Sequence, residues 1–197
     1  SGIYAPDYIP EKWLINLYSN NDIRKAVWFG THKLTYQNIN GNAVIFKKFP
    51  GNPTLQDPKK ATSDYINKIK LFRVAEQYLI AAEAYAYSGN EDKANEYLNA
   101  LRSAREVGYT EVLLSGDDLK EAIKSERVKE LVGEGFRFYD LKRYAKGLTR
   151  SEAQNTSIIT NAGSTQTELF SANANDFRWL WPIPQAEIDS NPQISEQ

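Results

Sequence analysis

Two glutamates on one predicted helix are the residues in this chain best suited to chemistry. Glu126 and Glu130 stand four residues apart, where the apolar helix face begun by Leu119 and Ile123 would continue. Retaining glycosidases place two carboxyl groups about 5 Å apart, and an i,i+4 pair could meet that spacing. One hypothesis is therefore a glycosidase that uses Glu126 and Glu130 as its acid and base.

The alternative for the same glutamates is structural. Carboxylates on a core-facing stripe are unfavourable unless they are paired and hydrogen-bonded. Because arginines match these acids, we expect a buried ion-pair network that sets the helix register, and no enzyme activity. Alanine at Arg137 would then cost about 3–5 kcal/mol by leaving a carboxylate unpaired. The available arginines are Arg73, Arg102, Arg105, Arg127, Arg137 and Arg143.

Aromatic residues make up 12% of the chain, which calls for a core, an interface or a ligand to account for them. A ring can cover the apolar face of a pyranose while polar side chains bind its hydroxyls. The candidate ligand-binding residues are Trp28, Tyr36, Trp13 and Tyr18; for each, packing in the core is the alternative. Trp179 and Trp181 lie beside prolines that favour an extended segment, and we expect both to pack in the core.

Composition excludes several classes of function. With 24 basic and 25 acidic residues, the chain offers no case for nucleic-acid binding. It has no cysteine and a single histidine, His32, so we expect no metal site and no cofactor. No apolar run reaches the roughly 18 residues that a membrane helix needs.

Two stretches of apolar residues at helical spacing are separated by Gly89-Asn90, which can end one helix and cap the next. Together they predict an antiparallel helix hairpin in the pattern of a tetratricopeptide repeat. One such repeat cannot bury its own face, so further helices must complete the stack. A third helix is expected from Ser115-Gly-Asp-Asp118 to Leu131. The two stripes are Leu71, Ala75, Tyr78, Ala82 and Tyr85, then Ala94, Tyr97, Leu98, Leu101 and Ala104.

The predicted fold is mainly α, with tetratricopeptide-like helix hairpins, long irregular loops and one small β-hairpin. Helical sequence runs from about Asp64 to Ala145, and residues 147–175 read as a surface loop. The β-hairpin is expected where residues 34–39 and 44–49 flank Asn40-Gly41-Asn42. We divide the chain into an irregular loop and hairpin region, 1–62, and a helical region, 63–197, within one structural unit.

Three ordered motifs follow one another along the chain: Arg73-Val-Ala-Glu76-Gln-Tyr78-Leu-Ile-Ala-Ala-Glu83, Glu126-Arg127-x-x-Glu130-Leu131-x-x-Glu134-Gly135-x-Arg137-x-x-Asp140, and Trp181-Pro182-Ile183-Pro184-x-x-Glu187-Ile188-x-x-Asn191-Pro192. Together they resemble the C-terminal region of the SusD/RagB family. An early Asn21-Asp22-Ile23-Arg24 and the pair Lys48-Phe49 resemble further elements of that family.

This resemblance implies a lipid-anchored protein on the outer-membrane surface of Bacteroidota. Such a protein binds glycan without catalysis and captures nutrient for a SusC-like TonB-dependent transporter. Its only membrane attachment would be a lipid anchor that these residues do not include. Because family members are longer, we expect a C-terminal fragment or a reduced member. A tetratricopeptide-type peptide- or protein-binding adaptor remains the first alternative, and the glycosidase the second.

Overall fold

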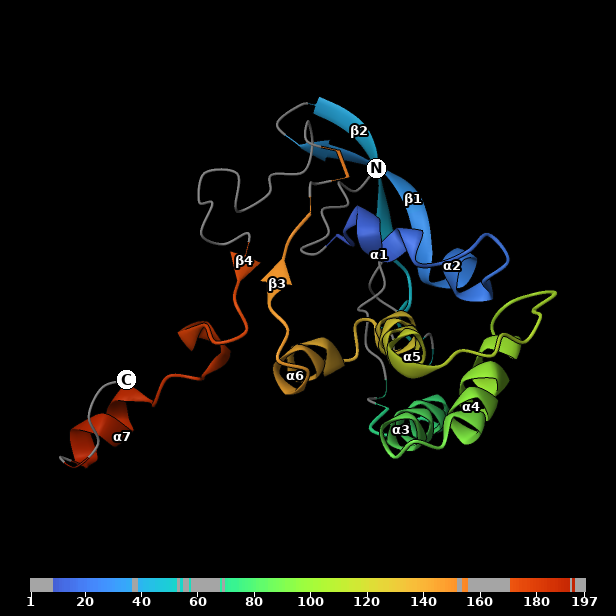
Figure 1. Ribbon diagram of the computed structural model, residues 1–197. Coiled ribbons are helices and arrows are strands. Elements are labelled where there is room, and N and C mark those ends of the chain that lie inside the picture. Colours follow the sequence, from blue (N-terminus) through green and yellow to red (C-terminus); the bar gives the residue numbers. More distant parts are fainter. Residues whose placement is uncertain are drawn as a thin grey trace. The chain divides into compact units, whose positions relative to one another are not determined.

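The computed structural model describes residues 9–36, 39–52, 54, 57, 68, 70–151, 154–155, 171–191 and 193 (Figure 1). The chain forms two compact units, which are described separately. Residues 1–137 and 151–161 make the first unit, and residues 138–150 and 162–197 make the second. The boundary predicted between residues 62 and 63 lies outside the described residues.

Three helices form the core of the first unit: α3 (Val74–Tyr87), α4 (Glu91–Ser103) and α5 (Gly116–Leu131). Helices α3 and α4 pair through a tight turn, in which Gly89 has a φ of +83° and the side chain of Asn90 accepts a hydrogen bond from the Lys93 amide at 3.2 Å. The predicted hairpin and its cap are therefore confirmed. Six side chains at the centre pack together: Ala82, Ala86, Ala94, Leu98, Leu119 and Ile123.

The ends of these helices differ from the prediction in two places. Helix α3 begins at Val74, because Arg73 is extended, and Leu71 lies before the helix with its side chain exposed. Helix α5 begins after Ser115 as expected, but the Ser115 side chain makes no capping bond. Instead, the Gly116 amide donates to the Glu91 carboxylate at 2.7 Å, which ties the start of α5 to the start of α4.

The β-hairpin is confirmed, but its predicted turn is wrong. Strands β1 (Phe29–Tyr36) and β2 (Ile39–Phe46) pair with Tyr36 opposite Ile39, so Asn40, Gly41 and Asn42 lie within β2. This register places Leu34 and Ala43 in one small core and Phe29 in another. Burial on both sides thus outweighs the local turn preference of Asn-Gly.

Two short helices that the sequence did not predict precede the hairpin: α1 (Lys12–Asn16) and α2 (Ile23–Trp28). Leu14 and Tyr18 pack with Phe29 of β1, and the Tyr18 and Phe29 rings meet edge to face at 5.1 Å. This cluster joins the N-terminal segment to the hairpin.

One side chain protects the outer edge of β2. The amide of Gln154 accepts a hydrogen bond from the Val44 N–H at 2.8 Å and donates to the Val44 carbonyl at 3.0 Å. It thereby replaces a neighbouring strand at that position, which satisfies backbone groups that an edge strand leaves open.

The second unit contains most of α6 (Phe136–Arg143), the short paired strands β3 (Leu148–Thr149) and β4 (Ser171–Ala172), a 3-10 helix (Phe177–Trp179) and α7 (Gln185–Ser190). Trp179 is buried as predicted, with its ring 5.4 Å from that of Phe138. The same prediction for Trp181 is wrong, since its side chain is 79% exposed. Trp179 ends the 3-10 helix and Trp181 follows it, so the two rings do not continue along one extended face and burial of the first does not bury the second.

No helix in the described part of the chain is both long enough and apolar enough to cross a membrane.

Helix α6 ends in an unfavourable conformation that one substitution should relieve. Ala145 has a φ of +49°, and the Lys146 amide donates to the Leu141 carbonyl at 2.9 Å, as at helix ends that favour glycine. We expect Ala145→Gly to raise the free energy of unfolding by about 1 kcal/mol, measured by urea denaturation. The control is Ala100→Gly inside α4, which should lower it by about 1 kcal/mol. A loss of stability at both positions would contradict the interpretation that Ala145 has an unfavourable backbone conformation.

Candidate functional site

The two glutamates singled out by their spacing lie in the interior of the first unit. The side chains of Glu126 and Glu130, both on α5, are fully buried. The described structure therefore gives neither carboxylate an open groove in which a substrate could meet it.

Arg24 of α2 lies between these carboxylates. Its Nη2 is 2.7 Å from Glu126 Oε1, and its Nη1 donates to Glu130 Oε2 at 2.9 Å. Its Nε and Nη2 also donate to the two oxygens of Asp22, at 2.9 and 2.7 Å. Asp22 in turn caps α2 by accepting from the Arg24 amide at 3.0 Å. One buried guanidinium thus bridges three buried carboxylates.

A second set of cations surrounds Glu130. Arg73 Nη1 donates to Glu130 Oε1 at 2.7 Å, and Arg105 donates from Nε and Nη2 at 3.0 and 3.1 Å. Arg73 precedes α3 and Arg105 follows α4, so Glu130 holds both ends of the helix hairpin against α5. Arg73 and Arg105 were among the partners that the sequence predicted.

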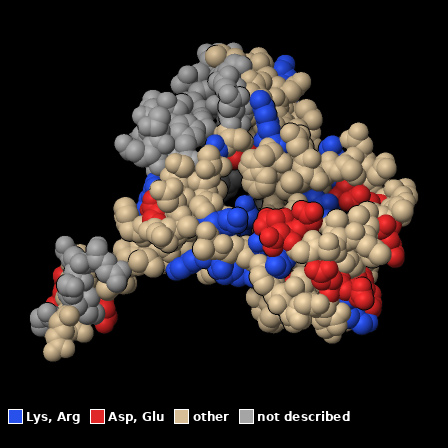
Figure 2. Space-filling model, in the orientation of Figure 1, with Lys and Arg blue, Asp and Glu red and all other residues tan. Residues whose placement is uncertain are grey.

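Glu126 has two further cationic partners. Arg102 Nε donates to Glu126 Oε2 at 3.1 Å, and Lys129 Nζ lies 3.0 Å from the same oxygen. Lys129 also contacts Glu106 at 3.3 Å, beyond the end of α4. The network therefore extends across α2, α4 and α5. On the surface above α4 and α5, acidic and basic atoms also lie close together (Figure 2).

Lys48 caps the C-terminal end of α5. Its Nζ donates to the carbonyls of Glu130 and Val132, each at 2.9 Å, and pairs with Glu134 at 2.5 Å. The same ammonium lies 4.0 Å from the centroid of the Trp28 ring, a cation–π distance. Lys48 thus neutralises the negative end of the helix and fixes one face of Trp28.

The network sets the charge states of its members. Burial would raise the pKa of Glu130, but hydrogen bonds from Arg105 and Arg73 lower it to about 2. Burial likewise opposes ionisation of Glu126, yet Arg24, Lys129 and Arg102 hold its pKa below the usual range. A general acid needs a raised pKa and access to the leaving group, so this arrangement suits permanent ion pairs and opposes the glycosidase hypothesis.

Three of the predicted arginine partners are placed elsewhere. Arg127 lies 4.0 Å from Glu83 of α3, and Arg143 pairs with Asp140 at 2.8 Å within the second unit. Arg137 is exposed, with its guanidinium 5.7 Å from the centroid of the Trp13 ring. Because this side chain is exposed, we expect its loss to cost less than about 1 kcal/mol, below the roughly 3–5 kcal/mol expected from the sequence.

The four candidate ligand-binding rings have different surroundings. Tyr18 is buried, and its hydroxyl donates to the Lys129 carbonyl at 2.8 Å, so the structure gives this ring a packing role. Trp28 is half-buried between Lys48 and the cluster that Leu14, Tyr18 and Phe29 form. Tyr36 ends β1, and its side chain lies outside the described residues. Trp13 alone among them has a described ring at the surface, with its side chain 36% exposed.

Trp13 is also held in a defined orientation. Its indole N–H donates to Glu11 at 2.7 Å, and the same carboxylate oxygen accepts from the amide and hydroxyl of Ser151 at 3.0 and 3.1 Å. A surface ring with fixed orientation and an arginine over it can contact a sugar and bind its hydroxyls with little loss of entropy.

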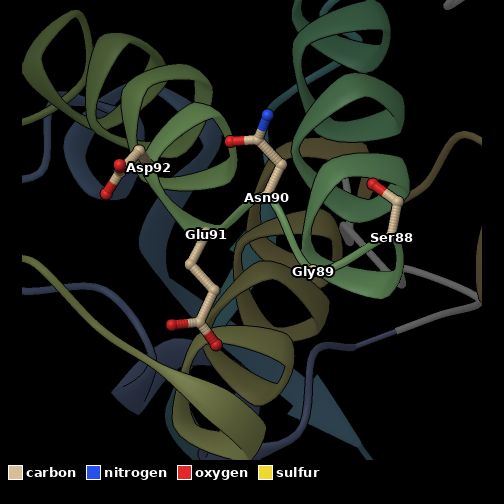
Figure 3. Close-up of a pocket in the computed structure, with 5 residues that line it drawn as sticks. All are labelled: Ser88, Gly89, Asn90, Glu91 and Asp92. Atoms are coloured by element: carbon tan, nitrogen blue, oxygen red, sulfur yellow. The ribbon is translucent and has the colours of Figure 1, made fainter.

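A surface pocket of about 480 Å³ lies at the turn between α3 and α4 (Figure 3). It is lined by Ser88, Gly89, Asn90, Glu91 and Asp92. Asn90 and Glu91 already bond the ends of α4 and α5, and the lining has no aromatic ring. The polar side chains of Asn90 and Glu91 in this pocket therefore serve to cap the starts of α4 and α5. Among the described residues, no group of acidic, histidine or cysteine side chains could hold a metal ion.

Arg24 is the central member of the network, and it was not predicted as a partner from the sequence. Its signal was present, because Asp22-Ile-Arg24 matched a motif and Asp is a favoured helix cap. More than a hundred residues separate Arg24 from Glu130, so helical spacing could not connect them.

The SusD family model matches residues 43–197. The chain belongs to the SusD family. The predicted resemblance is thereby confirmed, as is the mainly helical fold with tetratricopeptide-like pairs and one small β-hairpin.

Proteins similar to this chain include two from Formosa agariphila. SusD-like protein P38 of Formosa agariphila is 29% identical over 136 residues, which cover 65% of this chain and 24% of that protein. SusD-like protein P25 of the same organism is 33% identical over 129 residues, covering 64% and 23%. The chain therefore spans about a quarter of the length of these curated relatives.

Solved SusD-like structures agree with the fold. A SusD-like carbohydrate binding protein from Bacteroides vulgatus is 30% identical, with a TM-score of 0.57 over 73% of this chain and 29% of its own. A SusD superfamily protein from Bacteroides fragilis is 26% identical, with a TM-score of 0.62 over 92% of this chain and 35% of its own.

Removing the central cation should be far more damaging than removing an exposed one. We expect Arg24→Met to lower the free energy of unfolding by about 3–5 kcal/mol, because it leaves buried carboxylates without their shared partner. Chemical denaturation measures the change, and Arg137→Met is the matched control, with an expected loss below about 1 kcal/mol. Equal effects at the two positions would show that the α5 acids are solvated.

The lowered pKa of Glu130 predicts sensitivity to acid. Its contribution to stability should be complete above its ordinary value of 4.5 and disappear as the pH falls through about 2. We expect the stability difference between the wild type and Glu130→Gln to shrink across this window in denaturation curves recorded at several pH values. A difference that stays constant from neutral pH to pH 2 would rule out the ionised pair.

Proposed function

We propose that this chain is part of a glycan-binding protein that captures nutrient without catalysis for a SusC-like TonB-dependent transporter. Membership of the SusD family is the observation that carries this proposal. It is supported by the relative from Bacteroides vulgatus that is described as a carbohydrate binding protein. A lipid-anchored location on the outer-membrane surface forms part of the same proposal.

The geometry of the acids supports binding over hydrolysis. A glycosidase would need Glu126 or Glu130 at a solvent-accessible bond, but both are buried and paired with arginines. Under this proposal, aromatic side chains at the surface contact the glycan. Of the proposed binding residues, Trp13 best meets the physical requirements, because its ring is exposed, oriented by Glu11 and flanked by Arg137. Trp28 and Tyr36 remain part of the proposed site, whereas Tyr18 packs in the core beside Trp28.

Substitution of the two N-terminal tryptophans separates binding from stability. We expect Trp13→Ala to weaken binding of a soluble oligosaccharide about fivefold, because a lost stacking contact is worth about 1 kcal/mol, and to leave Tm nearly unchanged. Trp28→Ala should lower Tm, since it removes the ring that contacts Lys48 and packs on the cluster of Leu14, Tyr18 and Phe29. Calorimetric titration against a panel of plant, algal and host glycans gives the affinities.

The control is Trp181→Ala, which removes an exposed tryptophan from the second unit and should leave affinity unchanged. If no glycan in the panel binds and peptides do, the tetratricopeptide-type adaptor is the correct function. Release of reducing ends from any glycan would instead contradict the non-catalytic assignment.

A further inference from the structure

An arginine lies over the Trp13 ring, so a ligand at this surface would meet a cation as well as an aromatic side chain. The Arg137 guanidinium carbon is 5.7 Å from the centroid of the ring, and the arginine side chain is exposed. Arginine contacts an aromatic ring through the flat face of its guanidinium. Such a contact uses none of the N–H groups, which lie at the edge of the guanidinium plane and donate hydrogen bonds.

Hydrogen bonds hold the ring on which this guanidinium lies. The Trp13 indole N–H donates to Glu11 Oε2 at 2.7 Å. The same oxygen accepts from the amide and the hydroxyl of Ser151, at 3.0 and 3.1 Å, and Ser151 lies 140 residues further along the chain. The support for Arg137 is therefore ordered before any ligand binds, which lowers the entropic cost of binding.

The charged groups of this surface favour a ligand that accepts hydrogen bonds and is negatively charged. Arginine donates up to five hydrogen bonds and accepts none. Lys12, which precedes Trp13, is exposed and adds a second cation. The nearby carboxylate of Glu11 already accepts three hydrogen bonds at one oxygen. A carboxylate on a sugar presents two acceptor oxygens that match the fork of an arginine, and a sulfate ester presents charged acceptor oxygens as well.

We propose that Arg137, supported by Trp13, makes this surface selective for acidic glycans, which carry a uronic-acid carboxylate or a sulfate ester. The inference rests on the glycan-binding function proposed above and adds the chemical class of the sugar. Arg137 contacts the anion, whereas Trp13 positions Arg137 and contacts the sugar ring. The anion accepts charge-assisted hydrogen bonds from the guanidinium that a neutral hydroxyl cannot replace at equal strength.

Pairs of oligosaccharides that differ only in charge test this selectivity. Oligogalacturonate is compared with its methyl ester, and oligo-carrageenan with its desulfated form, by calorimetric titration of the 197-residue chain. In at least one pair we expect the acidic member to bind about tenfold more tightly, because the neutral member lacks the charge-assisted hydrogen bonds. The pair that responds distinguishes a carboxylate ligand from a sulfate ligand. Added salt should narrow the difference, because the contact is exposed.

Substitution of Arg137 assigns the selectivity to its guanidinium. We expect Arg137→Gln to weaken binding of the acidic member about tenfold and to leave the affinity for the neutral member unchanged, with Tm within about 1 °C of the wild type. Arg137→Lys keeps the charge without the fork and should recover only part of the affinity. The matched control is Lys12→Gln, which removes the same charge beside Trp13. Because adjacent helix positions do not face each other, it should change the affinity less than about twofold.

Three outcomes would contradict the proposal in different ways. Equal losses in Arg137→Gln and Lys12→Gln would overturn it, because general attraction between opposite charges would then explain the binding. Binding of neutral glycans alone, in these pairs or in the wider panel, would overturn the selectivity and leave the proposed function intact. If no glycan binds at all, the selectivity and the proposed function are both wrong.

Discussion

The guanidinium of Arg24 lies among Asp22, Glu126 and Glu130, with less than 3 Å separating it from each carboxylate. A buried cation in this position cannot shift without leaving a carboxylate uncompensated, and a carboxylate here cannot lose its charge without stranding the cation. The short helix α2 is therefore bound to α5 in one register. Through Glu130 the same constraint reaches Arg73 and Arg105, at the two ends of the α3–α4 hairpin.

This constraint determines which residues are left for function. Buried ion pairs add little net stability compared with a packed apolar core, but they specify one arrangement of helices strongly. Glu126 and Glu130, the residues most suggestive of catalysis in the sequence, serve that purpose. In the function that we propose, ligand contact is left to rings that the first unit presents at its surface, as binding residues on scaffolds usually are. Trp13, oriented by Glu11 and Ser151, has this character.

Local rules predicted the parts of the fold that depend on local chemistry. Gly89 and Asn90 ended and capped helices as expected, and the acidic stripe of α5 was correctly judged to be structural. The predictions that failed depend on contacts between residues that are far apart in the sequence. The turn predicted at Asn40-Gly41 lies within β2, where the strand faces are buried. The central partner of the acids on α5 is Arg24, a residue far away in the sequence that helical spacing could not connect to them. The exposure of Trp181 likewise depends on packing around Trp179 that spacing does not encode.

The coupling energy between Arg24 and Glu130 tests most directly whether the acids of α5 hold the helices together. A double-mutant cycle with Arg24→Met, Glu130→Gln and the double variant, followed by denaturation at neutral pH, isolates this pair from the rest of the network. A favourable coupling of about 2 kcal/mol or more, with each variant still folded, is the result that the network predicts. A coupling near zero would contradict it and return Glu126 and Glu130 to the list of groups free to act on a substrate.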